Sequence, residues 1–159
     1  MTQQEALPLR VVLGALGLFA LFSQALLVPR EAGEYAAAYP SAAYLAVPYA
    51  VAVVAAIACF EVALLAAWQI LTAAVADAAP GSTTPKWANV VAVSLSLTGV
   101  ILAGICAHAG SVAGVGGPAM LLGVLAGLGL VPAAFALRAR LRRLSSGPAP
   151  GNHGLIRGS

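Results

Sequence analysis

An uninterrupted apolar run from Tyr49 to Ala76 constrains this chain more than any other feature of its sequence. The run contains one carboxylate, Glu61, and one carboxamide, Gln69, and nothing else that is strongly polar. At about 1.5 Å of rise per residue, a helix of this length crosses a hydrocarbon core of roughly 30 Å with residues to spare. The run therefore predicts a membrane-spanning helix, with Glu61 at a depth where carboxylates are costly.

The composition excludes an ordinary soluble domain. Hydrophobic residues make up 61% of the 159 residues and charged residues only 8%, whereas about a quarter of the residues in a soluble domain are charged. Four apolar runs fill most of the chain, which predicts an all-α fold, an integral membrane bundle of four transmembrane helices. The expected parts are an N-terminal segment (1–10), a transmembrane domain (11–137) with helices at about 11–29, 49–76, 87–109 and 118–137, and a basic, disordered C-terminal tail (138–159).

The first apolar run is longer than that of a cleaved secretory signal. It follows Arg10 and continues to Pro29, whereas a signal peptide has about 7 to 15 apolar residues before a small-x-small cleavage site. We therefore expect a retained first helix.

Three segments rich in turn-forming residues predict the connections between the helices. Residues 30–47 combine prolines and tyrosines, which favours a loop with an interfacial turn. The polar segment 77–86 and the glycine-rich segment 110–117 predict a linker and a short turn. Gly123 and Gly127 form a small-xxx-small pair, which we expect to pack inside the bundle rather than to drive dimerisation.

The distribution of basic residues predicts the orientation. Lys and Arg near the ends of spans favour the cytoplasmic side. With both termini cytoplasmic, only Arg30 faces outward, and six basic residues face inward: Arg10, Lys86, Arg138, Arg140, Arg142 and Arg143. The last four form a cluster that we expect at the membrane interface, in contact with lipid head groups rather than with nucleic acid. The predicted location is the inner (cytoplasmic) membrane, as a multi-pass protein.

Several short sequence features resemble the bacterial membrane family known as domain of unknown function 2975. They are Val28-Pro29, Tyr39-Pro40, Tyr44-Leu45, Pro48, the continuous segment Cys59–Leu71 (CFEVALLAAWQIL) and Lys86-Trp87. The resemblance covers roughly residues 10–143 and implies a four-helix membrane protein with no assigned activity, some of whose relatives are encoded beside a small helix-turn-helix regulator. Relatives usually carry several basic residues between the second and third helices. This chain is acidic and neutral there until Lys86, which disfavours docking of a regulator on that loop through charge.

A candidate polar site inside the membrane starts from Glu61, because an ionisable residue in a span is a functional hypothesis by default. Counting along the helices places Thr98 at nearly the same depth, Gln24 closer to the outer surface and His108 at that surface. A ladder from His108 through Gln24 to Glu61 would resemble a proton path. The interpretation we favour is simpler: Glu61 is protonated or hydrogen-bonded inside the bundle as a packing polar group.

The other reactive side chains do not form a recognisable catalytic pattern. Cys59 and Cys106 are expected about 10 Å apart along the helix axes, too far for a disulfide. The sequence contains no Ser-His-Asp arrangement, no metal-ligand spacing and no paired carboxylates. We therefore expect no enzyme, no metal and no cofactor.

Three functions stay open. The first is a non-catalytic membrane sensor or regulator that acts through a protein partner. The second is a small proton-coupled transporter or channel that uses Glu61, which would need a homo-oligomer to enclose a path. The third is a structural subunit of a membrane complex.

Overall fold

The computed structural model describes residues 3–75, 84–111 and 117–145. These residues form helices and no strand, which confirms the all-α prediction. In chain order the elements are α1 (Gln3–Phe22), the π-helical turn η1 (Ser23–Leu27), α2 (Val28–Ala38), the 3₁₀ helix η2 (Pro40–Leu45), α3 (Ala46–Val75), α4 (Thr84–Ser111) and α5 (Pro118–Ser145).

Four helical stretches are long and apolar enough to cross a membrane. They are Ala6–Ala38, Pro40–Val75, Pro85–Ser111 and Pro118–Arg143. A helix of about 20 residues already spans the hydrocarbon core, so each stretch is sufficient by length. The predicted membrane bundle of four spans is confirmed, and its helices contact the lipid bilayer.

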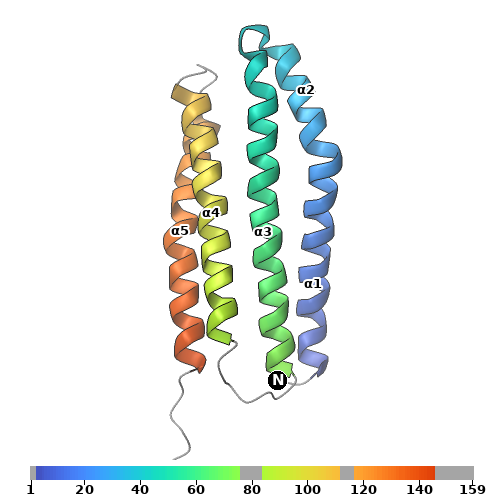
Figure 1. Cartoon of the computed structure of the whole chain (residues 1–159), viewed down its shortest axis with the longest axis vertical. Helices are drawn as coiled ribbons and strands as arrows, with labels where there is room; N and C mark the ends of the chain where they lie inside the picture. Colours follow the sequence, from blue (N-terminus) through green and yellow to red (C-terminus); the bar gives the residue numbers. More distant parts are fainter. Residues whose placement is uncertain (1–2, 76–83, 112–116, 146–159) are drawn as a thin grey trace, which may run out of the picture.

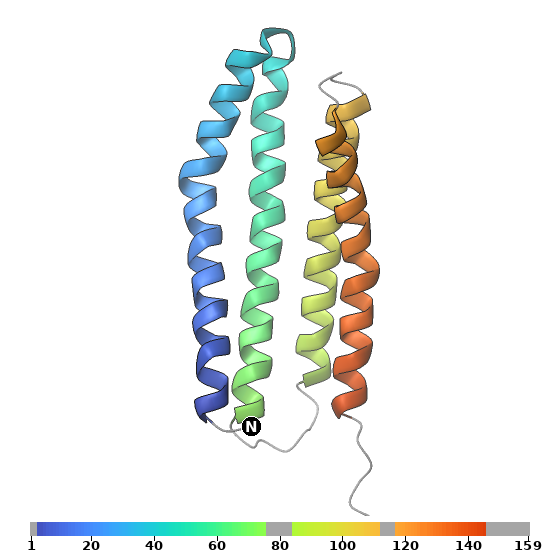
Figure 2. The ribbon, with the colours of Figure 1, turned by 180° about the vertical axis from the view of Figure 1, so that it is seen from behind.

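The four spans stand side by side in a row. In Figure 1, and from behind in Figure 2, α3 and α4 lie in the middle, with α1 on one side and α5 on the other. The most extensive packing is between α4 and α5, followed by α3 and α4, whereas α1 and α2 contact α3 much less. The described parts of α1 and α5 make no extensive contact with each other. The first and last described residues lie on opposite sides of the row but at the same end of the helices, the lower end in Figure 1.

Small side chains fill the interior of the protein, and large apolar side chains cover its surface. Among the described residues, the buried hydrophobic ones are alanines except for Leu71 and Val91. By contrast, Leu18 is 71% exposed and Leu65 is 67% exposed. Such a surface is stable only in lipid, where close approach of helices through small residues replaces the hydrophobic effect as the main source of packing.

Helices α4 and α5 approach each other closely through glycines. A Cβ atom added to Gly99 would collide with the backbone carbonyl oxygen of Gly127, and one added to Gly127 would lie 3.0 Å from the Cβ atom of Ala103. Gly123 faces the Cys106 side chain in the same interface. Both glycines of the small-xxx-small pair therefore pack within the chain, against α4.

The first span continues past Pro29, where the sequence suggested that the helix ends. A proline inside a helix removes a backbone hydrogen bond and crowds the carbonyl four residues before it. Here the wider turn η1 immediately precedes it, with the Val28 N–H donating to the Ser23 carbonyl five residues back, and such turns adjust the ladder locally. The segment 30–47, expected to be a loop, is therefore mostly helical, as α2 and η2.

The last span is also longer than its predicted range of 118–137, because α5 continues to Ser145. The basic cluster lies in the final turns of α5 instead of in a tail. Arginine is a good helix former. Its positive charge is also stabilising near a helix C-terminus, because that end of the helix dipole is negative. Most of the linker at 77–86, the centre of the turn at 110–117 and the tail from 146 onward lie outside the described residues.

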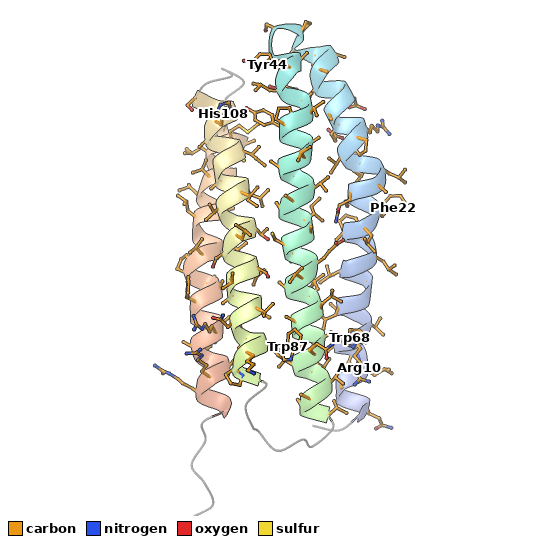
Figure 3. All side chains as sticks on the ribbon, viewed as in Figure 1. Arg10, Phe22, Tyr44, Trp68, Trp87 and His108 are labelled. Atoms are coloured by element: carbon orange, nitrogen blue, oxygen red, sulfur yellow. The ribbon has the colours of Figure 1, made fainter. Side chains whose placement is uncertain are left out.

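Two layers of polar and aromatic side chains bound the apolar part of the row. We call one the Trp end, with Arg10, Trp68 and Trp87, and the other the Tyr end, with Tyr44 and His108 (Figure 3). The separation along each helix is about 20 residues, or roughly 30 Å, which equals the hydrocarbon thickness. The pairs that define it are Arg10 and Arg30, Trp68 and Tyr49, Trp87 and His108, and Arg138 and Pro118.

The close contact between α4 and α5 predicts an effect of Gly127→Ala. The added methyl group meets backbone and Ala103, which have little room to move, so the free energy of unfolding should fall by about 1 to 3 kcal/mol. Titration with sodium dodecyl sulfate, followed by circular dichroism, measures this change. The control is Gly129→Ala on the same helix, since nothing lies within 4 Å of its added Cβ. Equal stability of the two variants would contradict the assigned contact.

Candidate functional site

Four aromatic rings form a continuous chain at the Tyr end. The ring centroid of Tyr35 on α2 lies 5.3 Å from that of Tyr39, the residue that follows α2. The ring of Tyr35 also lies 6.0 Å from that of Tyr49 on α3, edge to face. Tyr49 in turn lies edge to face with His108 on α4, at 5.9 Å. These distances and angles are typical of favourable aromatic contacts. The chain of rings therefore connects α2, α3 and α4.

One hydrogen bond reinforces this connection. The Tyr49 hydroxyl oxygen and the Nδ1 atom of His108 lie 2.7 Å apart. The two residues are 59 positions apart in the sequence, so the bond joins separate parts of the chain. The bond lies at the Tyr end, where Figure 3 labels His108.

A pocket of about 490 Å³ opens between α2 and α3 beside these rings, and we call it the Tyr-end pocket. Its size is within the usual range of small-molecule sites. Its polar and aromatic lining comes from Glu31, Glu34, Tyr35, Tyr39 and Tyr49, and its apolar lining includes Leu27 and Val53.

The two carboxylates of the Tyr-end pocket have different surroundings. Glu34 accepts a hydrogen bond from Arg30, with 2.9 Å between Nε and Oε1, in a salt bridge one helical turn apart on α2. Glu31 is exposed and has no ion-pair partner in the described residues. In addition, the hydroxyl of Tyr35 is buried without a hydrogen-bond partner in the described residues. The pocket thus has one unpaired negative charge next to three tyrosine rings.

Glu61 lies in a second cavity, of about 430 Å³, between α1 and α3, which we call the Glu61 groove. The rest of its lining is almost entirely apolar, and Gly14 and Gly17 form part of its α1 side. The Oε1 atom of Glu61 is buried and has no hydrogen-bond partner in the part of the chain that the structure describes. A buried polar atom without a partner is costly, which makes this position a candidate functional residue.

The Glu61 groove ends at a contact between a cation and an aromatic ring. The Arg10 guanidinium carbon lies 6.0 Å from the ring centroid of Trp68, which also lines the groove. This separation is at the limit for a cation–π interaction. The contact joins α1 to α3 at the Trp end (Figure 3).

In the described residues, the four polar residues that the sequence grouped have different surroundings. The Thr98 hydroxyl lies at the contact of α3 and α4, 3.1 Å from the Ala56 carbonyl oxygen and 3.0 Å from that of Ser94. Gln24 lies in η1, and its amide nitrogen is buried without a partner among the described residues. His108 bonds to Tyr49. In the described residues, no hydrogen bond joins any two of Glu61, Thr98, Gln24 and His108.

The remaining candidate groups form no further cluster. Cys59 and Cys106 are free thiols. In the described ranges, no group of three or more His, Cys, Asp or Glu side chains is placed to hold a metal ion. In the basic cluster, Arg140, Arg142 and Arg143 are exposed, whereas the Nε atom of Arg138 is buried.

The pairing of Tyr49 with His108 is what sequence reasoning missed. Counting residues already placed both near the outer surface, so the depth signal was present. Residue counting does not give the direction in which each side chain points around its helix. It also did not predict the helix α2, which brings the ring of Tyr35 to Tyr49, with Tyr39 packed against Tyr35.

These features define the class: an α-helical, multi-pass membrane protein with a pocket at one end of its spans and a buried carboxylate inside them. The chain belongs to the family described as "Protein of unknown function (DUF2975)", whose profile matches residues 31–142. The resemblance seen in the sequence is thereby confirmed. Neither the curated proteins nor the solved structures include a significant match to this chain.

The bond between Tyr49 and His108 predicts the effect of Tyr49→Phe. This change removes the hydroxyl and keeps the ring, so the free energy of unfolding should fall by about 1 kcal/mol, as for a typical hydrogen bond. Unfolding in mixed detergent micelles measures the loss. Tyr44→Phe is the matched control, because its side chain is 74% exposed and should show no loss. The bond would be refuted if both variants were as stable as the parent.

Proposed function

We propose that this chain is a non-catalytic sensor or regulator in the inner membrane that acts through a protein partner. The observation that carries the proposal is the connection between the Tyr-end pocket and α4. Tyr49 both lines the pocket and bonds to His108. A ligand that displaces the Tyr49 ring therefore weakens a contact between α3 and α4.

The proposal places both termini and the Trp end in the cytoplasm. Most basic residues next to the spans gather at that end: Arg10, Lys86 and the cluster from Arg138 to Arg143. This distribution follows the positive-inside rule. The Tyr-end pocket then faces the outside of the cell, and the end of α5 with the basic cluster faces a cytoplasmic partner.

The partner should be detectable from the end of α5. We expect a photo-crosslinking amino acid in place of Arg140, which is exposed, to capture one protein in native membranes. The yield should change with Tyr49→Phe, because the pocket acts through that side chain, and should stay the same with Tyr44→Phe. Recovery of no defined protein, or a yield indifferent to Tyr49→Phe, would count against the proposal.

A second candidate function has its own observation. The buried, unpartnered Oε1 atom of Glu61 in an apolar groove favours a proton-coupled transporter or channel. The spans of one chain form a row, in which the outermost helices α1 and α5 make no extensive contact in the described residues. This function therefore needs a second copy of the chain to enclose a path.

The transport hypothesis predicts a different dependence on mutation. Glu61→Gln should abolish a proton-driven flux in liposomes, because the amide and the carboxylic acid are similar in shape but the amide does not ionise. Thr98→Val should leave the flux intact, since the Thr98 hydroxyl lies at the contact of α3 and α4. Persistence of the flux in Glu61→Gln, or loss of it in both variants, would exclude the proton role of Glu61.

A further inference from the structure

We propose that the Tyr-end pocket binds an amphipathic organic cation, with its ammonium group against Glu31 and the tyrosine rings and its apolar portion toward Leu27 and Val53. This inference names the ligand class of the sensor proposed above and rests on that proposal for its role. Binding itself is a property of the purified chain and needs no partner.

The charge in the pocket favours a cation. Glu31 lines the pocket and has no ion-pair partner in the described residues, whereas the charge of Glu34 is balanced by Arg30. With Glu34 neutralised by Arg30, the polar part of the lining keeps one net negative charge, that of Glu31. An anion there would meet Glu31 without compensation, since Arg30 is already held by Glu34 at 2.9 Å.

The aromatic rings favour an organic ammonium rather than a metal ion. Tyr35 has neighbouring ring centroids at 5.3 and 6.0 Å, in Tyr39 and Tyr49. Ring faces attract an ammonium group that lies within about 6 Å of the centroid, and this arrangement is the common mode of recognising quaternary ammonium. A metal ion would require several oxygen or nitrogen ligands at much shorter distances.

The depth of the pocket favours a ligand with an apolar portion. Leu27 and Val53 lie three and four residues inside the levels of Arg30 and Tyr49, or about 5 to 6 Å within the hydrocarbon. Glu31 and Tyr35 lie on the opposite, water-facing side of Arg30 along α2. One molecule in the pocket thus contacts water-facing charge at one end and lipid-level apolar side chains at the other.

The same chemistry could come from a free amphiphile or from an amine-bearing lipid head group. The test uses octyltrimethylammonium and the purified full chain in nanodiscs of phosphatidylglycerol, a lipid without an amine, with binding to empty nanodiscs subtracted. We expect saturable binding of one molecule per chain. Octyl sulfate, with the same tail and the opposite charge, and tetramethylammonium, with no tail, should bind much more weakly.

Two variants and one control assign the binding to this pocket. Glu31→Gln and Tyr35→Leu should each weaken binding of octyltrimethylammonium by about fivefold, as expected for partly exposed ionic and cation–π contacts. Tyr44→Leu should bind like the parent, because Tyr44 is exposed and does not line the pocket. Since Glu31 is also exposed, Glu31→Gln remains decisive if Tyr35→Leu fails to fold.

The outcomes distinguish a lipid head group from a free cation as the ligand, and the cation site from the sensor function. Displacement of the probe by added phosphatidylethanolamine supports a lipid head group as the natural occupant, and absence of displacement supports a free cation. Equal binding of octyl sulfate, or parent-like binding by Glu31→Gln, overturns the inference. Binding that follows these expectations while crosslinking at position 140 finds no partner would leave the cation site standing and remove the sensor function.

Discussion

Close approach of helices through small side chains is the constraint on which this structure depends. In lipid, an outward-facing leucine gains nothing by moving inward, so the interior is built where backbones come close. The contact of Gly99 with Gly127 and the buried alanines along α3 and α4 allow such close approach. The contact of α1 with α3 is less extensive than these. The row is therefore firmly joined from α3 to α5 and loosely joined between α1 and α3.

The candidate sites occur where that packing is loosest. The contact of α1 and α2 with α3 is closed at the Trp end by Arg10 and Trp68 and at the Tyr end by Tyr35 and Tyr49. Between these ends lies the Glu61 groove, and beside the Tyr-end rings lies the Tyr-end pocket. Glycines on the α1 side leave the groove open, because Gly14 and Gly17 face no atom within 4 Å of an added Cβ.

Sequence reasoning gave the membrane class and the number of spans, because hydropathy and length are properties of each segment alone. Sequence reasoning ended the first span at Pro29. The turn η1, which lets the helix continue past this proline, is a local backbone rearrangement that the amino-acid composition does not indicate. The same reasoning grouped Glu61 with Thr98, because residue counting gives depth but not direction around the helix. Thr98 reaches Ala56, and Glu61 lies five residues further along α3, about 140° around its axis. Pairing of Tyr49 with His108 was hidden for the same reason.

In the described residues, two hydrogen bonds between α3 and α4 differ in a way that bears on the proposed sensor function. The Thr98 hydroxyl reaches the Ala56 carbonyl in the buried interior, where water does not compete and the geometry is held by packed alanines. The bond between Tyr49 and His108 lies at the Tyr end, next to the pocket, and is exposed rather than buried among helices. In the proposed sensor, a ligand that displaces the Tyr49 ring would break the exposed bond and leave the interior bond of Thr98 intact. For the proposed sensor we therefore expect a ligand to move α3 against α4 at the Tyr end, while the Thr98 contact holds the two helices together in the interior.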